Sequence, residues 1–600
     1  MVELTPIVLC LSRAGEATAH RVAAALSAPV HGRAGRVASA DAFFPNALDH
    51  ARMLFQAGHP IIGVCAAGIL VRAVAPVLAD KRSEPPVIAI PDDGSTVIPL
   101  LGGHHGANRL AKQIAEALQS HAAVTTAGDV SLGIALDEPP AGWRLANPED
   151  AKPVMMAMLN GQAPIIEGEN IWGLEAGAGP VKLVSSEAPV QTGPEVLSYH
   201  PQRYALGLGC ARGCDVNEMW ALVQGSLTAA NIAPEAIACV ASLDLKADEP
   251  AMIETAKRLG VPFRVFTAAE LEAEAGRLAN PSEVVFAEVG CHGVAEGAAL
   301  AIAGPDAALT VEKQKTLNAT CALSRAPAPI VELAGRPRGK LSIVGIGPGQ
   351  HSWRTPEAST LIAEAEELVG YGLYIDLLGP LAAGKKRSDF PLGGEEDRCR
   401  YALEQAGKGH NVALICSGDA GIYAMGALVF ELLDRGPEAL GVSEAARRVE
   451  VVSTPGVSAL QGAAARAGAP LGHDFCAISL SDLLTPRADI VKRLKAAAAG
   501  DFVIAFYNPV SKRRRTLLAE ARDILLGHRP ADTPVMLASN LGRPTEAVRY
   551  VRLDALEVDD VDMLTVVLVG SSNSKLAQLG EGPRMYTPRG YARKIDGDLS

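Results

Sequence analysis

The 600-residue chain has few aromatic residues, no two cysteines at C-x-x-C spacing and no long apolar run. Aromatic residues make up 4% of the sequence, and its ten cysteines are scattered. The closest two, Cys210 and Cys214, do not have the C-x-x-C spacing of zinc ligands or redox dithiols. The sequence therefore predicts neither a disulfide framework nor a metal site, which is typical of a protein kept in a reducing cytoplasm.

An excess of basic charge is also missing. The chain carries 55 Lys and Arg against 67 Asp and Glu, a formal net charge of −12, so it lacks the basic face that general nucleic-acid binding requires. The apolar run near the start, within TPIVLCLSRAGEATAH, is too short for a signal peptide, and no stretch reaches the roughly 18 apolar residues of a membrane span. We expect a cytoplasmic protein that binds neither nucleic acid nor membranes.

The residues that are present describe a globular chain of several domains. Hydrophobic residues make up 48% of it, and 600 residues exceed what one core usually supports. In the N-terminal half, residues 5–11 predict a strand and Glu16 to Leu26 a helix, and similar segments alternate up to residue 129. This alternation predicts a multidomain α/β fold in which a parallel or mixed sheet is covered by helices.

A glycine-rich loop dominates the C-terminal half. The apolar run at 341–344 leads into GIGPG at 345–349, a pattern typical of a buried strand whose end approaches a ligand, because glycine has no Cβ and tolerates positive φ. No Gly-Lys-Ser/Thr follows, and the spacing is not G-x-G-x-x-G, so neither common phosphate-binding pattern is present. By itself, the loop fits a tight strand-to-helix turn equally well.

Five short motifs follow one another in an order that resembles the tetrapyrrole methylase family. They are GIGPG at 345–349, SGDAG at 417–421, TPGVSA at 454–459, ISLSDLLTP at 478–486 and FYNPVSKRR at 506–514. Members of this family transfer a methyl group from S-adenosylmethionine to a carbon of a porphyrin-like macrocycle. The last two motifs are most similar to those of the precorrin-3B C(17)-methyltransferases, which contract the ring in cobalamin synthesis. The similarity extends from Lys340 to about Tyr591. The sequence departs from the family at Ala420, where Pro is more common, and at Arg487, where Trp is expected.

The resemblance implies a fold of two subdomains with the active site in the cleft between them. Methyl transfer from a sulfonium is an in-line displacement that needs no metal, so such an enzyme acts mostly by positioning two reactants and excluding water. The residues that the family pattern assigns to S-adenosylmethionine and its surroundings are Gly345, Gly347, Pro348, Gly349, Gly418, Asp419, Gly421, Ile422, Ser458, Ala459, Tyr507, Asn508, Thr565 and Val566.

The substrate implied by the family places two further demands on the site. Ring contraction needs a group that moves a proton at a tertiary alcohol, and Asp419 is the candidate, although an Asp in this position also fits the cap of the next helix. The carboxylates of a corrinoid require cations near the cleft. The candidates are Lys492, Arg493, Lys495, the run Lys512 to Arg515, Arg543 and Arg549, and for the run a solvated helix start is an equally good interpretation.

The N-terminal half resembles a second family, the cobalt-precorrin-5A hydrolases of cobalamin synthesis. ILVRAVAPVLADK at 69–81, LLGGHHGANRLAKQIA at 100–115 and VTTAGD at 124–129 are similar to the N-terminal part, and GCHGVAEGAAL at 290–300 and LTVEKQKTLNATCALSRA at 309–326 to the C-terminal domain. The two resemblances together predict hydrolase-like domains at 1–135 and 201–326, a small middle region at 136–200, a linker at 327–340 and a methylase at 341–591.

Two adjacent histidines stand in the segment GGHHGANR at 102–109. Consecutive residues of a strand point to opposite faces, and no other ligand types lie nearby at metal spacing, so we predict no metal here. A helix that begins near Ala107 presents free N–H groups and the positive end of its dipole to an anion. His104 or His105 would then activate the water that opens a lactone, Asn108 would cap the helix or bind substrate, and His292 would join them if the two domains face each other. Histidines with satisfied imidazoles at a glycine-rich helix entry are the alternative.

The expected binding partner is a corrinoid intermediate. Because methylases of this family are commonly dimers, the resemblance also implies a homodimer through the methylase half and hand-over of the intermediate to other cobalamin enzymes. Two alternatives stay open. The N-terminal half could bind the intermediate without catalysis, or the methylase could act on another tetrapyrrole.

Overall fold

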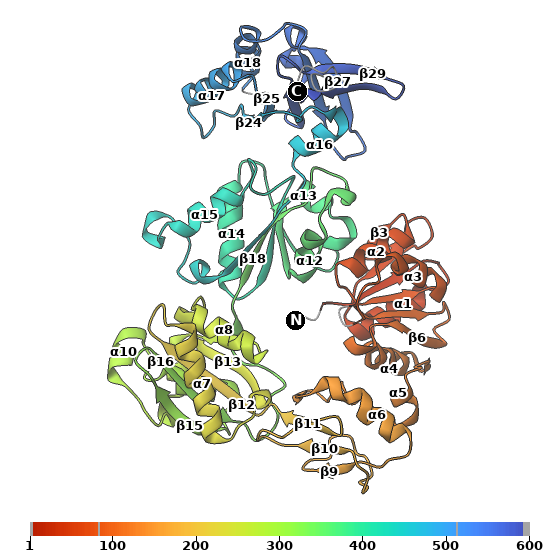
Figure 1. Cartoon of the computed structure of the whole chain (residues 1–600), viewed down its shortest axis with the longest axis vertical. Coiled ribbons are helices and arrows are strands. Elements are labelled where there is room, and N and C mark those ends of the chain that lie inside the picture. Colours follow the sequence, from red (N-terminus) through yellow and green to blue (C-terminus); the bar gives the residue numbers. More distant parts are fainter. Residues whose placement is uncertain (1–3, 82–83, 512–513, 592–600) are drawn as a thin grey trace.

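The computed structural model describes residues 4–81, 84–511 and 514–591 and consists of five parts, each built around its own sheet or sheets (Figure 1). We name them the first domain (residues 7–131), the small domain (143–201), the third domain (204–337), the lower lobe (340–454) and the upper lobe (459–586). Strands and helices alternate in most of them, so the expected multidomain α/β architecture is confirmed.

The first domain is a mixed sheet with helices on both faces. Its strands are β1 (Ile7–Cys10), β2 (Val30–Arg33), β3 (Ala42–Phe44), β4 (Ile61–Val64), β5 (Val87–Ile90), β6 (Thr96–Leu101) and β7 (His121–Ala122), in the order β3-β2-β1-β4-β5-β6-β7. One face is covered by α1 (Glu16–Leu26) and α4 (Ala107–Leu118), and the other by α2 (Ala47–Gln56) and α3 (Ala67–Val74); the short α5 is Ala127–Ser131. The predicted strand at 5–11 and helix at 16–26 are confirmed.

The next two parts are smaller sheets. The small domain contains α6 (Ala151–Leu159) and the strands β8 (Trp143–Leu145), β9 (Ile165–Glu167), β10 (Lys182–Ser185) and β11 (Val196–Pro201), in the order β8-β11-β10-β9. The third domain has the order β15-β16-β12-β13-β14-β17, formed by β12 (Tyr204–Cys210), β13 (Ile237–Leu243), β14 (Phe263–Phe266), β15 (Ala308–Lys315), β16 (Ala319–Arg325) and β17 (Arg336–Pro337). Its helices are α7 (Val216–Ala230), α8 (Pro250–Leu259), α9 (Ala268–Glu272), α10 (Glu283–Val289) and α11 (Val294–Ala303).

The lower lobe is an all-parallel sheet. Its strands, β18 (Lys340–Gly345), β19 (Glu367–Tyr371), β20 (Lys386–Phe390), β21 (Asn411–Cys416) and β22 (Glu450–Thr454), lie in the order β20-β19-β21-β18-β22. The helices are α12 (Pro356–Glu364), α13 (Gly372–Asp376), α14 (Glu395–Gly407) and α15 (Gly426–Asp434). Because helices cover both faces, the central strands β18 and β21 are buried along almost their whole length.

The upper lobe contains a five-stranded and a three-stranded sheet. The larger has the order β24-β25-β28-β26-β27, formed by β24 (Phe475–Ser479), β25 (Val503–Tyr507), β26 (Pro534–Ser539), β27 (Ala547–Arg552) and β28 (Thr565–Val569). The smaller contains β23 (Gly468–Ala469), β29 (Lys575–Leu579) and β30 (Gly582–Tyr586), and the helices are α16 (Ala459–Ala467), α17 (Arg487–Ala499) and α18 (Leu517–Leu526).

The segment between the halves, expected to be a linker, adds a strand to the third domain. Within it, β17 pairs antiparallel with β14 through Arg264 and Pro337, and the sheet of the lower lobe begins only three residues later at Lys340. The prolines and charges of this segment gave no periodic signal, because an edge strand of two residues is too short to show one.

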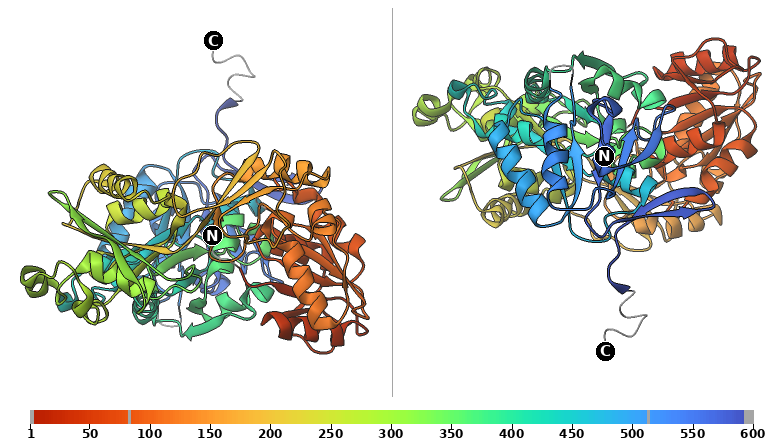
Figure 2. Two further views of the ribbon diagram at one scale, coloured as in Figure 1. Left: turned by 90° about the horizontal axis from the view of Figure 1, so that it is seen from below. Right: turned by 90° about the horizontal axis from the view of Figure 1, so that it is seen from above.

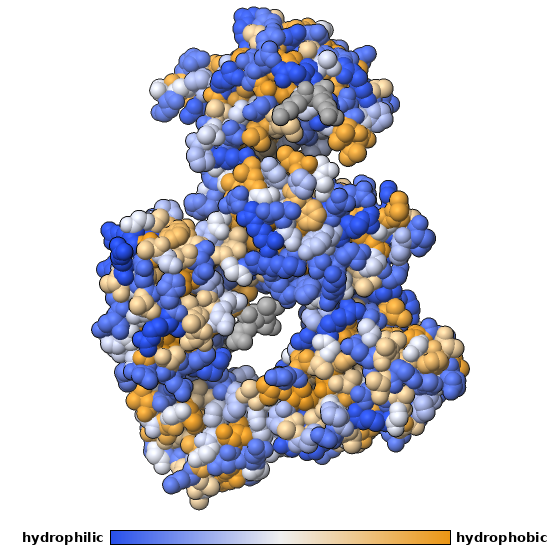
Figure 3. Space-filling view, turned by 180° about the vertical axis from the view of Figure 1, so that it is seen from behind, coloured by the Kyte–Doolittle hydropathy of each residue, from blue (hydrophilic) through white to orange (hydrophobic). Residues whose placement is uncertain are grey.

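The chain folds back on itself, so the first domain packs against the lower lobe. In both views of Figure 2 the first domain lies to one side of the lobes. Its core continues into that of the lower lobe: Leu54 and Phe55 of α2 belong to the same buried apolar cluster as Leu361 of α12 and Leu381. The first, small and third domains and the lower lobe together surround an opening that passes through the molecule (Figure 3). A non-covalent interface therefore closes a ring of four parts.

Within the described residues, no single helix is long and apolar enough to cross a membrane. Only α10 and α11 taken together reach that length and composition, and they are bent by 80° where they meet.

Three buried histidines lie in the first domain, on the side that packs on the lower lobe. His31 on β2 and His50 on α2 share a hydrogen bond of 3.0 Å between ring nitrogens, and Phe44 stacks on His50 at 4.4 Å. His59 pairs its Nδ1 with the carbonyl oxygen of Thr5 at 3.0 Å. Burial lowers the pKa of His31 and of His59 to about 4 and that of His50 to about 3.

We expect acid to destabilise this domain at pH values well above those at which carboxylates titrate. A histidine whose folded pKa lies below its unfolded value of about 6.5 stabilises the fold fully above pH 6.5, and this contribution is lost as the pH falls towards 4. At pH 5 each ring costs up to roughly 2 kcal/mol. Urea unfolding of the full chain at pH 7 and pH 5 measures the loss, and hydrogen exchange of amides in β1, β2 and α2 locates it.

The control for this experiment is the exposed His20 on α1. His20→Gln should keep the wild-type pH dependence, whereas His50→Phe should reduce it because one titrating ring is removed. Equal stability of the wild type at the two pH values would contradict the prediction.

Candidate functional site

Three loops of the lower lobe meet at one edge of its sheet, where they face the upper lobe (Figure 1). They follow the neighbouring strands β21, β18 and β22, which are parallel, so all three loops lie at the carboxyl ends of strands. This is the edge at which open α/β sheets bind ligands. The motifs GIGPG after β18, SGDAG after β21 and TPGVSA after β22, which we call the first, second and third loops, are therefore brought together in space.

Glycine residues let these loops touch backbone to backbone. Gly347 and Gly418 exchange two hydrogen bonds of 3.1 and 2.9 Å, and their φ angles are +76° and +70°. A Cβ atom at Gly345 would lie 2.7 Å from the Gly418 carbonyl oxygen, and one at Gly456 would overlap the same oxygen. No other residue type fits at these positions without moving a loop.

Asp419 fastens the second loop to the third. Its Oδ1 accepts a hydrogen bond from the Gly421 N–H at 2.8 Å, and its Oδ2 accepts one from the Gly456 N–H at 3.0 Å. The interpretation of Asp419 as a helix cap is wrong, because α15 begins at Gly426 and its cap residue is Met425. The carboxylate acts between loops rather than within one helix.

The start of α16 carries the next pair of expected residues. Ser458 caps the helix: its Oγ accepts from the Gln461 N–H at 3.2 Å, while Gln461 Oε1 accepts from the Ser458 N–H at 2.8 Å. Tyr507, at the end of β25, accepts a hydrogen bond from the Leu460 N–H at 2.9 Å, and burial raises the pKa of its phenol. Ala459, Tyr507 and the buried Val566 pack on one apolar cluster.

Two of the expected residues direct their polar groups inside the upper lobe. The Thr565 hydroxyl donates to Asp562 Oδ1 at 2.6 Å and lies 2.7 Å from Ser539 Oγ. Asn508 has a φ of +50°, and its amide donates to Ser479 Oγ at 3.2 Å, which ties the ends of β24 and β25 together. Ile422, by contrast, is 37% exposed and belongs to the second loop.

A polar network that the motifs did not indicate joins the two lobes beside the first loop. Arg466 of α16 lies 4.6 Å from the ring centre of Trp353, and its Nε is 2.6 Å from Glu546 Oε1. Glu546 also accepts from the Gly542 N–H at 2.6 Å. These residues are single and far apart in the chain, so no spacing in the sequence could have grouped them.

The predicted cations are distributed unevenly around this site. Arg543 donates from Nε to the Pro348 carbonyl oxygen at 3.3 Å, so it touches the first loop. Lys492 and Lys495 line a shallow surface groove between α17 and α18, Arg549 pairs with Asp560 at 3.3 Å, and Arg515 pairs with Asp559. Lys512 and Arg513 lie outside the described residues. Among the described candidates, Arg543 is the one whose contact with the glycine loop the structure records.

The segment at 102–109 differs from its expected geometry. Gly103–His105 forms a 3-10 turn rather than a strand, so the argument from alternating faces does not apply to the two histidines. Because β6 runs antiparallel to β5, this turn lies where β5 begins: a Cβ at Gly102 would stand 2.6 Å from Pro86 Cα. α4 begins at Ala107, as predicted. The side chain of His104 lies outside the described residues, and the His105 N–H donates to the Gly102 carbonyl oxygen at 2.9 Å.

Asn108 joins the two first-domain motifs instead of capping α4. The prediction of a cap is wrong, because Gly106 occupies the cap position and Asn108 is the second residue of the helix. Its amide donates to Thr126 Oγ1 at 2.8 Å and to Asp129 Oδ2 at 2.9 Å, and Lys112 pairs with the other oxygen of Asp129 at 2.6 Å. GANR and TTAGD thus form one polar cluster.

His292 does not meet this cluster. Its Nδ1 lies 2.8 Å from Glu272 Oε1, and its ring stacks on Phe286 of α10 at 4.4 Å. Since α10 and α4 lie on opposite sides of the molecule in Figure 1, the expectation that His292 reaches the same cleft is wrong. No group of three His, Cys, Asp or Glu side chains arranged for a metal occurs in the described part of the chain.

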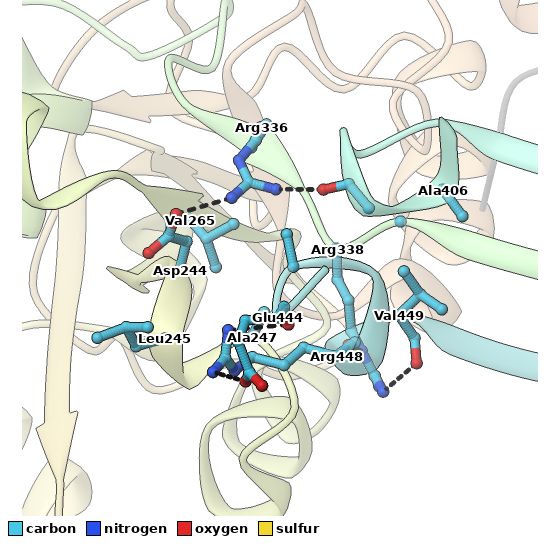
Figure 4. Close-up of a pocket in the computed structure, with 13 residues that line it drawn as sticks. Asp244, Leu245, Ala247, Val265, Arg336, Arg338, Ala406, Glu444, Arg448 and Val449 are labelled. Carbon is cyan, nitrogen blue, oxygen red and sulfur yellow. Dashed lines mark hydrogen bonds and ion pairs between the residues drawn. The ribbon is translucent and has the colours of Figure 1, made fainter. Parts of the chain in front are cut away.

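A cavity of about 210 Å³ lies between the third domain and the lower lobe (Figure 4). On one wall Arg336 bridges the two parts, since its guanidinium lies 2.8 Å from Asp244 Oδ2 and donates to the Gly407 carbonyl oxygen at 2.9 Å. On the other, Arg338 donates to the carbonyl oxygens of Arg448 and Val449. The two guanidinium groups point in different directions in Figure 4, and both bind protein atoms. We therefore interpret this cavity as a gap in the packing between two domains rather than as a ligand site.

Comparison with known proteins agrees with this division of the chain. Residues 49–129 match the family model described as "Cobalamin synthesis G N-terminal", residues 204–324 match "Cobalamin synthesis G C-terminus", and residues 340–557 match "Tetrapyrrole (Corrin/Porphyrin) Methylases".

Individual relatives resemble the two lobes. A precorrin-3B C(17)-methyltransferase of Sinorhizobium sp is 42% identical over 255 residues, which cover 42% of this chain and 98% of that protein. A cobalt-factor III methyltransferase of Priestia megaterium is 41% identical over 258 residues, 43% of this chain and 46% of that protein. The crystal structure of the methyltransferase CobJ is 39% identical, with a TM-score of 0.39, and covers 42% of this chain and 100% of that one. Both resemblances inferred from the motifs are confirmed, and the chain belongs to the tetrapyrrole methylase family through its two lobes, preceded by both cobalamin synthesis G domains.

Proposed function

We propose that the chain is a bifunctional enzyme of cobalamin synthesis. The two lobes use S-adenosylmethionine to methylate precorrin-3B at C(17), with contraction of the ring to precorrin-4. The first, small and third domains open the lactone of a cobalt-precorrin-5A type intermediate and release acetaldehyde. The observation that carries the first activity is the 42% identity to a C(17)-methyltransferase over 98% of its length, with all three glycine loops joined at one edge.

The loops fit the proposed cofactor. A Cβ atom at Gly418 would have its nearest neighbours at 3.8 Å, in Ser458 and Ala459, so this loop presents bare backbone towards the start of α16. Exposed side chains of Ile422 and Tyr423 lie beside it, and Tyr423 stands 5.2 Å from the Tyr507 ring. Such a site offers backbone groups, an apolar side chain and aromatic rings to an adenosyl group. S-adenosylmethionine, when bound, supplies an electrophilic methyl group.

The protein groups act by position and charge. The interlocked glycine loops hold the backbone rigid at the reacting centre, and orientation of this kind supplies much of the catalysis in displacement reactions. Arg543, held against the first loop, offers a guanidinium to a carboxylate of the macrocycle. We also propose, from the family, that the protein forms a homodimer through the lobes and hands its intermediate to other enzymes of the pathway.

Purified full-length protein tests the main proposal. With precorrin-3B and methyl-labelled S-adenosylmethionine, we expect one labelled methyl group per macrocycle, at C(17), in cobalt-free or cobalt-containing substrate. Mass spectrometry and NMR of the product identify the position and the contracted ring. Transfer to uroporphyrinogen instead would show that the family assignment is right and the substrate is not.

Asp419→Asn should weaken binding of S-adenosylmethionine about tenfold, or about 1.4 kcal/mol. The amide keeps one acceptor but turns an NH₂ group towards one of the two backbone N–H donors, which separates the second loop from the third. Calorimetry of the purified variants measures the affinity. Asp434→Asn, at an exposed position on α15, is the matched control. Normal affinity combined with lost turnover would instead identify Asp419 as the group that moves the proton.

The N-terminal activity is tested by the release of acetaldehyde from a lactone-bearing corrinoid. Asn108→Ala removes the bond between α4 and the segment at 126–129, so we expect at least a tenfold lower rate, with methyl transfer unchanged. Gln113→Ala, exposed on the same helix, should be neutral. His104→Ala and His105→Ala should lower the rate as well.

Two results would overturn this part. Loss of the activity on adding a chelator would contradict metal-independent lactone opening. Full activity of the Asn108 variant and of both histidine variants would place the chemistry elsewhere. If the wild type binds the corrinoid but releases no acetaldehyde, the N-terminal half is a binding module.

A further inference from the structure

The interface between the first domain and the lower lobe contains a buried guanidinium. Arg354 follows the first glycine loop and is 8% exposed. Its Nε donates to Ser359 Oγ at 3.1 Å within the lower lobe, and its terminal nitrogen lies 3.3 Å from the sulfur of Met53 on α2 of the first domain. No ion pair recorded for the described residues includes Arg354. A buried cation without a carboxylate partner is costly, so the few contacts that it makes determine where it lies.

The neighbouring residue, Trp353, touches both sides of the proposed active site. Its carbonyl oxygen lies 3.0 Å from the position of a Cβ at Gly347, and its ring lies 3.1 Å from that of a Cβ at Gly462 on α16. The ring also packs under Arg466 of the upper lobe. Trp353 therefore lies between the first glycine loop and α16, and its size sets the distance between the loop and the upper lobe.

Further contacts hold the first domain in place around this point. α2 packs on α12, and β3 packs on the turn Gly379–Ala382. A Cβ at Gly384 of the lower lobe would lie 3.3 Å from Pro29 of the first domain. Lys385, the next residue, is half-buried and donates to the carbonyl oxygens of Ala363 and Ala365 at 2.6 and 2.8 Å, which fixes this segment within the lower lobe. The docked position is thus defined by close packing over several elements.

We propose that the first domain positions the active-site loop of the methylase, with Arg354 as the positioning residue that connects Met53 to Trp353 and so to Gly347. The inference rests on the proposed function for its catalytic consequence. The N-terminal half then contributes to methyl transfer by its docked position, in addition to any reaction of its own. When α2 leaves this surface, Arg354 gains water, Trp353 loses its fixed neighbour and the glycine loop loosens.

Variants at Met53 test this in the full-length protein. Met53→Lys places an ammonium against the buried guanidinium and should drive the two surfaces apart. We expect hydrogen exchange of amides at 346–355 to become at least tenfold faster, S-adenosylmethionine to bind at least fivefold more weakly, and acetaldehyde release to stay within twofold of wild type. Met53→Leu, which keeps the apolar contact, should behave nearly as wild type. Gln56→Lys, exposed on the same helix, adds the same charge without contact and is the matched control.

A second variant separates positioning from general damage. In the background of Arg354→Met, the change Met53→Lys should have a much smaller effect, because the second cation is gone. If Met53→Lys leaves exchange at 346–355 and cofactor affinity at wild-type values while the first domain stays folded, the inference is wrong. Equal effects of Met53→Lys with and without Arg354 would also overturn it. A wild type that transfers no methyl group contradicts the proposed function alone, because hydrogen exchange reports on the loop without substrate.

Discussion

Backbone contact between three loops is the constraint on which the methylase half depends. The loops after β18, β21 and β22 approach so closely that Gly345 and Gly456 both face the carbonyl oxygen of Gly418. Side chains cannot enter there, so the loops are held by hydrogen bonds between Gly347 and Gly418 and by the Asp419 carboxylate. A surface of bare backbone can approach a ligand closely and stays rigid, which is what orientation of two reactants requires.

This constraint explains why contacts far from the loops matter. Three of the five residues at 345–349 are glycines without side chains, so the position of this loop relative to the upper lobe depends largely on the residues that border it. Trp353 packs against Gly347 within the lower lobe, and Arg543 of the upper lobe donates a hydrogen bond to the Pro348 carbonyl oxygen. Trp353 is in turn tied to the upper lobe through Arg466 and Glu546, and the adjoining Arg354 contacts Met53 of the first domain. The position of the first loop in the site therefore depends on the first domain as well.

Local signals predicted local features well. The helix at 16–26 and the start of α4 were correctly predicted because apolar periodicity depends only on neighbouring residues. The loop motifs were grouped by their resemblance to one family, and the structure brings three of them together because they follow neighbouring strands of one parallel sheet. The direction of β6, which moves the turn at 103–105 to the edge where β5 begins, depends on pairing within the sheet and has no signal in the sequence. Likewise Asn108 was expected to cap α4 or to bind substrate, whereas its partners in the structure are Thr126 and Asp129, which are 18 and 21 residues away.

The reversal of β6 also separates two surfaces of the first domain. α2 and β3 face the lower lobe, whereas α4 leads to α5, which packs on α6 of the small domain. The polar cluster of Asn108, Thr126 and Asp129 lies with α4 and α5, on the side away from the docking surface. One domain can therefore stay docked on the methylase and still present a separate polar surface to a second intermediate. Since the small and third domains connect the first domain covalently to the lower lobe, they keep it at a high effective concentration near its docking surface, which favours the docked state over the free one.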